Sequence, residues 1–197
     1  MSKFWFFVCV LAAGMGVWKA WGERTQSHPP GIVAPDVPYQ KNLSSPVELV
    51  RGEYRLVGRA EFDITARVIL KMRYRFDKFA AVSPVDFAMG WGEMSDSAVL
   101  EKMSCNQGSR FYGCSWKSSD VIEPRRFTAL SANMHMIPAT PEVEDALMRV
   151  RQGQVVNLRG LLVDVLGPDG GWNTSMTRED SGPGGCEIIL VGAVSTL

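Results

Sequence analysis

Apolar and polar residues alternate almost without interruption between positions 60 and 76. The even positions carry Ala60, Phe62, Ile64, Ala66, Val68, Leu70, Met72, Tyr74 and Phe76. A period of two residues predicts a β-strand with one buried and one solvated face, as in an antiparallel sheet or a small barrel. At about 3.3 Å per residue the run is longer than a usual strand, so we expect it to curve, to carry a bulge or to split in two.

Shorter strand patterns lie on both sides of this run. Residues 54–58 predict a strand that ends in a turn or bulge at Gly58. Three further antiparallel strands and a bulge at Gly160 are expected near the end of the chain, over residues 153–166, 172–177 and 186–194. The patterns together predict a mainly β fold with a minor α+β character, a small antiparallel barrel similar to the oligonucleotide/oligosaccharide-binding (OB) fold.

Helical signals are few. Thr140 as N-cap and Pro141 in the first turn predict one clear helix over about residues 140–151. Two short inserted helices are expected over residues 84–90 and 95–103.

The first 22 residues predict a membrane segment. Residues 4–22 contain a single charged side chain, Lys19, and Trp18 and Trp21 are suited to a membrane interface. We expect an uncleaved single-pass anchor over residues 1–22, a cleaved signal peptide and an N-terminal core helix being the alternatives. Charge alone leaves the orientation nearly balanced, but the three-residue tail before the run favours a bacterial inner-membrane protein with its domain in the periplasm.

The next stretch, residues 23–46, holds five of the 11 prolines in the chain. It has neither helical nor alternating periodicity, which predicts an extended, Pro-rich extracytoplasmic linker. The β-rich globular domain is then expected over residues 47–197.

Composition narrows the classes of function. The 197 residues suffice for one hydrophobic core, and 21 basic against 21 acidic side chains disfavour general binding to polyanions. Two histidines and four cysteines without a Cys-x-x-Cys pair predict neither a metal site nor a cofactor.

Two cysteines enclose a compact segment that predicts a hairpin or loop. Outside the cytoplasm a disulfide between Cys105 and Cys114 is permitted, and we predict that bond. A bridge from either of them to Cys186, or free buried thiols, are the alternatives, and Cys9 belongs to the membrane segment.

Two features are candidates for binding. Trp91 stands between Gly90 and Gly92, where the backbone can approach a ligand or partner closely, although a buried structural anchor explains the same pattern. Four bases share the polar side of the long strand and predict a ridge for an acidic partner or a phosphate: Arg67, Lys71, Arg73 and Arg75. The alternative is a solvated face that protects a strand edge.

Catalytic signals are weak. His135 is the only histidine of the expected domain and hence the one conventional general base, with Asp86 or Asp96 as its acid partner. No convergent nucleophile, base and oxyanion set accompanies it, so a structural histidine near Asn133 is the main alternative.

Three stretches carry a resemblance: residues 73–77, 83–96 (SPVDFAMGWGEMSD) and 131–139 (SANMHMIPA). They resemble a group of uncharacterised bacterial membrane-anchored envelope proteins. The resemblance implies an envelope location and no activity.

The leading functional hypothesis is a non-enzymatic, membrane-anchored periplasmic module that binds or assembles with an envelope protein. The alternatives are an envelope hydrolase built on His135 and, if the domain is cytoplasmic, an OB-like binder of single-stranded nucleic acid.

Overall fold

The computed structural model describes residues 24–168, 170–180, 182 and 184–197. The predicted anchor over residues 1–22 lies outside these ranges. Within them, no helix combines the length and the apolar character needed to cross a membrane.

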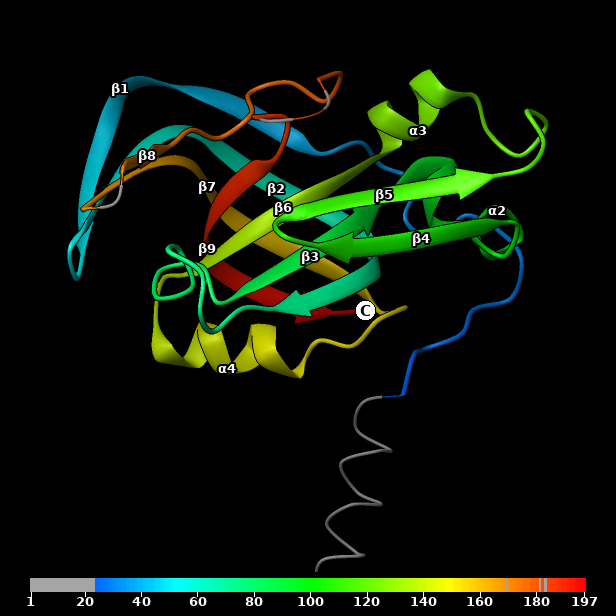
Figure 1. Cartoon of the computed structure of the whole chain (residues 1–197), viewed down its shortest axis with the longest axis horizontal. Helices are drawn as coiled ribbons and strands as arrows, with labels where there is room; N and C mark the ends of the chain where they lie inside the picture. Colours follow the sequence, from blue (N-terminus) through cyan, green and yellow to red (C-terminus); the bar gives the residue numbers. More distant parts are fainter. Residues whose placement is uncertain (1–23, 169, 181, 183) are drawn as a thin grey trace, which may run out of the picture.

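The described chain is mainly β, and its largest sheet bends round until two of its strands meet (Figure 1). The sheet order is β1-β2-β3-β6-β9-β7-β8, and β2 also pairs with β7, so that β2, β3, β6, β9 and β7 form a closed ring. The strands of the sheet are β1 (Tyr39–Arg51), β2 (Tyr54–Arg73), β3 (Val85–Gly90), β6 (Ser131–Pro138), β7 (Val155–Gly167), β8 (Gly170–Trp172) and β9 (Glu187–Thr196). Neighbouring strands are antiparallel except for the parallel pair β6–β9.

The long alternating run forms β2, as predicted. Its even positions from Ala60 to Val68 are buried in the main core of the ring. The register shifts between Gly58 and Ala60 against β7, and between Val68 and Leu70 against β3, which confirms the expected bulges. The expected strand was too long at its C-terminal end. Strand β2 ends at Arg73, and Phe76 is 98% exposed in the loop that follows.

One expected helix is a strand. Residues 84–90 lie largely in β3, where all six residues are buried between β2 and β6. Ser83 and Pro84 resemble a helix start locally, but Val85, Phe87 and Met89 alternate into the core, and that burial outweighs the capping signal.

The other helices are short. The clear helix is confirmed as α4 (Pro141–Arg149), in which the Thr140 hydroxyl accepts a hydrogen bond from Val143 N. The expected inserted helix is confirmed as α2 (Ser97–Leu100), preceded by a 3-10 turn η1 (Gly92–Ser95). Helix α3 (Pro124–Leu130) was not predicted.

The predicted hairpin is a separate two-stranded sheet of β4 (Met103–Gly108) and β5 (Phe111–Trp116). Cys105 and Cys114 lie opposite each other in its register, with Cα atoms 4.0 Å apart, and form a disulfide. That bond was predicted, and the third described cysteine, Cys186, is free.

The stretch interpreted as a linker contacts the fold, and its residues 39–46 already lie in β1. Ala34 is fully buried; its N–H donates to Ser95 Oγ, and its carbonyl accepts from Gly92 N. Gln26 lies so close to Gly153 that a Cβ atom at position 153 would overlap the Gln26 carbonyl. Proline-rich backbone is extended, and an extended segment can also hydrogen-bond to neighbouring segments of the same chain. Sequence periodicity does not reveal such docking.

The disulfide should stabilise the domain. Replacing Cys105 and Cys114 together by serine is expected to lower the free energy of unfolding by about 2 to 3 kcal/mol, at the low end because the loop is short. Denaturant unfolding of the double variant measures the loss, with Cys186→Ser as the control. An unchanged midpoint in the double variant would contradict the expectation.

Candidate functional site

Two members of the predicted basic ridge bind the C-terminal end of helix α4. Lys71 Nζ donates to the carbonyl oxygens of Leu147, Met148 and Val150, and Arg73 Nη2 donates to Met148 O. These contacts cap the C-terminal end of α4, where carbonyls lack helical partners and the helix dipole favours a cation.

The remaining members of the ridge do not complete a phosphate site. Arg67 is 8% exposed and donates to Ser95 O and Ser97 Oγ, whereas Arg75 is exposed in the loop after β2. Three of the four bases therefore donate to groups within the chain, and two of the four, Arg73 and Arg75, are exposed.

Trp91 lies in the core and not on an exposed binding loop. Its side chain is 1% exposed and belongs to the main core cluster, and its indole Nε1 has no hydrogen-bond partner. This favours the structural alternative over the binding alternative.

The structure brings His135 together with Asp86. The two residues pair directly across β3 and β6, which places His135 Nδ1 2.9 Å from Asp86 Oδ2, although the contact is poorly aligned for a hydrogen bond. Asp96, the other acid considered, instead caps α2; hydrogen bonds from Gly31 N and Ala98 N lower the pKa of its carboxyl.

The His135–Asp86 pair is closed to solvent. Asp86 is fully buried and His135 is 1% exposed, with the Trp172 ring 4.2 Å from the imidazole between ring centroids. A general base needs access to a substrate proton, so this burial favours the structural role of the histidine.

The residue that organises this region is Arg110, which the sequence did not single out. Its guanidinium donates to Asp86 Oδ1 at 2.7 Å and to both carboxylate oxygens of Asp77, at 2.8 and 2.9 Å. Asn133 Nδ2 donates to the Arg110 carbonyl at 2.9 Å. The acids come from β3 and from the loop after β2, so no local spacing could have indicated the cluster.

Cys186 borders the same cluster but is a poor nucleophile. Its sulfur lies 3.9 Å from Arg110 O. Burial, with further contributions from the charges of Glu187 and Asp86, raises the pKa of the thiol to about 12, so the thiol stays protonated at neutral pH. Within the described ranges no group of three or more metal-ligating residues could hold a metal ion.

A second buried charge lies at the start of β9. Glu187 is 1% exposed, and its Oε1 is 3.0 Å from Arg178 Nη1, while Oε2 has no hydrogen-bond partner. Burial raises the pKa of this carboxyl to about 7, against the opposing effect of Arg178.

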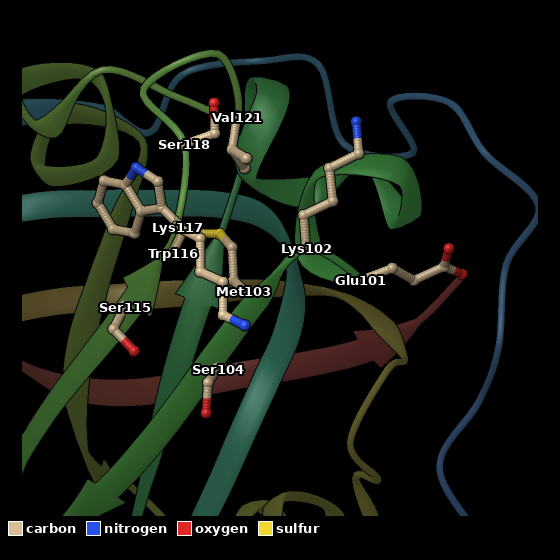
Figure 2. A pocket seen from close by; sticks show the side chains of 9 residues that line it. All are labelled: Glu101, Lys102, Met103, Ser104, Ser115, Trp116, Lys117, Ser118 and Val121. Atoms are coloured by element: carbon tan, nitrogen blue, oxygen red, sulfur yellow. The ribbon is translucent and has the colours of Figure 1, made fainter.

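An open hollow of about 670 Å³ lies beside the base of the β4–β5 hairpin. Met103, Trp116 and Val121 supply its apolar lining, and its rim carries Lys102, Lys117 and several serines. Figure 2 shows the Trp116 indole and the Met103 thioether on the hollow, with the Glu101 carboxylate pointing away from Trp116. The Trp116 ring packs on Phe127 at 5.3 Å between centroids, which holds the ring in place.

The hollow and the His135–Asp86 pair differ in what they can do. The pair is closed to solvent, whereas the hollow is accessible and combines an anchored aromatic ring with positive charge. Such a surface is suited to binding.

The buried Glu187 makes stability depend on pH. Its folded-state pKa of about 7 lies above its ordinary value of 4.5, so the folded state binds this proton more tightly than the unfolded state. The stabilisation is full below about pH 4.5 and is lost as pH rises through about 7. Relative to Glu187→Gln, the wild-type free energy of unfolding should therefore fall by about 3 kcal/mol over that interval. Urea titrations of both proteins at a series of pH values measure this, and parallel pH profiles would contradict it.

Comparison with protein-family models, with curated proteins and with solved structures finds no match to this chain.

Proposed function

We propose that the chain is a non-enzymatic binding module, anchored in the bacterial inner membrane, that holds a protein partner in the periplasm. The observation that carries the proposal is the contrast between the buried His135–Asp86 pair and the accessible hollow at Trp116. Chemistry at His135 would need solvent access, whereas binding at the hollow needs none of the buried groups.

The fold is proposed to be an OB-like barrel. Five strands close in the order β2-β3-β6-β9-β7 and back to β2, and α4 lies in the connection between β6 and β7. A closed five-stranded ring of this strand order, with a helix between its third and fourth strands along the chain, is typical of the OB fold. The fold by itself does not decide the ligand.

The proposed envelope location has three supports. The charge-poor run over residues 4–22 is of the kind that enters a membrane, and a disulfide such as Cys105–Cys114 persists in oxidising compartments. The resemblance of residues 83–96 and 131–139 to membrane-anchored envelope proteins points the same way.

The partner is proposed to be a protein rather than a nucleic acid. Arg67, Lys71 and Arg73 donate to groups within the chain, so they do not form a phosphate-binding row. A nucleic-acid interface usually interleaves such bases with exposed aromatic rings, and the hollow offers one ring with two lysines at its rim.

Topology is tested by C-terminal fusions to the full chain. Alkaline phosphatase, which requires the periplasm, should be active, and a cytoplasmic fluorescent reporter should remain dark. A bright cytoplasmic reporter with inactive phosphatase would exclude the periplasmic location.

Binding is tested in cells with a photo-crosslinking amino acid at Lys117, on the rim of the hollow, and at Lys41 on the exposed strand β1. A discrete protein adduct is expected at position 117 and not at 41. Trp116→Ala should reduce the adduct at least about tenfold, because aromatic residues at the centre of an interface contribute much of its binding free energy. Phe111→Ala, a half-exposed aromatic on the same strand, is the matched control and should leave the adduct unchanged. Equal adducts at both positions, or adducts insensitive to Trp116→Ala, would exclude the hollow as the binding surface.

A further inference from the structure

The guanidinium of Arg110 occupies a cage built by other parts of the chain. Its polar walls are the Asp86 carboxylate, both oxygens of Asp77 and the Ser83 carbonyl, the last at 2.9 Å from Nη2. The Tyr74 ring closes one side, with its centroid 3.7 Å from the central guanidinium carbon, and the Trp172 ring lies farther off at 5.5 Å. Paired carboxylates and an aromatic face are the features that recognise arginine rather than lysine.

Arg110 enters the cage from a strained position. It stands at the turn of the β4–β5 hairpin, where Ser109 and Arg110 both have positive φ, 50° and 68°. Two-residue hairpin turns usually place glycine, asparagine or aspartate at such positions, because other side chains are strained there. The contacts of Arg110 in the cage offset the cost of this backbone conformation.

The tip of the hairpin can separate from the ring without breaking a β-ladder. The β4–β5 sheet has no ladder pairing with the seven-stranded sheet, and its tip is held by the hydrogen bonds of Arg110 and Gln107 and by the Tyr112 ring, which packs on Phe127 at 5.7 Å between centroids. The Cys105–Cys114 disulfide preserves the hairpin when its tip moves. The base of the hairpin stays attached through an apolar cluster that includes Met103 and Trp116.

The chemistry of the cage determines what could replace Arg110. Asp86 is fully buried, and a buried carboxylate that loses its cation is strongly destabilised. Lifting the tip is therefore favourable only when another cation takes its place. The planar fork formed by Asp77 and Asp86, together with the Tyr74 ring, fits a guanidinium.

We propose that the cage of Asp77, Asp86 and Tyr74 is a recognition site for an arginine side chain of a protein partner, and that Arg110 fills the site until the partner displaces it. The site is separate from the hollow at Trp116 and does not depend on the function proposed for that hollow.

The test uses a fluorescein-labelled Gly-Arg-Gly peptide with a blocked C-terminus and the same peptide with citrulline, which keeps the shape of arginine and lacks its charge. Arg110→Ala in the full chain empties the cage, and should bind the arginine peptide at least about tenfold more tightly than the citrulline peptide. Wild type should bind the arginine peptide at least about tenfold more weakly than Arg110→Ala, because the tethered Arg110 competes at high effective concentration.

Arg126→Ala is the matched control. Arg126 pairs with Glu93 at an exposed position, so its loss leaves the cage filled and peptide binding should equal that of wild type. Adding Trp116→Ala to Arg110→Ala, where no tethered arginine competes, should leave binding of the arginine peptide unchanged, which separates this proposal from the role of the hollow. Equal binding of the two peptides to Arg110→Ala, or equal binding of the arginine peptide to wild type and Arg110→Ala, would overturn the proposal.

Arg110→Lys keeps the test decisive if Arg110→Ala does not fold. Lysine supplies a charge to Asp86 but not the planar fork, so the arginine peptide should bind more tightly to Arg110→Lys than to wild type. Methylguanidinium chloride should also raise the melting temperature of Arg110→Ala more than equimolar potassium chloride does. Binding to Arg110→Lys that is no tighter than to wild type, together with no rescue by methylguanidinium, would likewise overturn the proposal.

Discussion

The pairing of β2 with β7 is the constraint on which the rest of the structure depends. It runs from Arg55 opposite Leu166 to Arg67 opposite Val155, and it closes the sheet into a ring. Once closed, the ring has an inside that only alternate side chains can reach, so β2, β3 and β6 each present one set of residues inward and another outward. The bulge between Gly58 and Ala60 gives β2 the bend that closure requires.

Closure also leaves polar residues on the outer side of the ring, where they have to be covered. Asp86, Asn133 and His135 lie next to one another on β3 and β6, and for Asp86 and Asn133 the cost of burying polar groups is offset by hydrogen bonds to Arg110 from the distant hairpin. Removing one partner of such a buried ion pair typically costs about 3 to 5 kcal/mol. The tip of the hairpin and the loop after β2 are thus joined to β3 through the contacts of Arg110, and β8, which pairs with β7, brings the Trp172 ring to the same place.

The same logic explains the basic side of β2. Lys71 and Arg73 extend to the end of α4, whose carbonyls would otherwise lack partners, so side chains that suggest a binding ridge in the sequence serve as helix caps in the structure. Trp91 similarly lies in the core, although the glycines beside it suggest close access. A residue type reveals what contacts a side chain can make, but the partner it meets is decided by the fold.

The sequence alone determined the features that are written in local spacing. The alternation from Ala60 to Val68, the Thr140 cap of α4, the bulge at Gly160 and the cysteines of the β4–β5 hairpin are of this kind, because each depends on residues close together in the chain. The tertiary structure decided β3, where burial on both sides overrode a helix start at Ser83, and the docking of Ala34 on Ser95. It alone assembled Arg110 with Asp77 and Asp86, which come from separate segments. Their proximity follows from ring closure, and long-range closure leaves no periodic signal in the sequence.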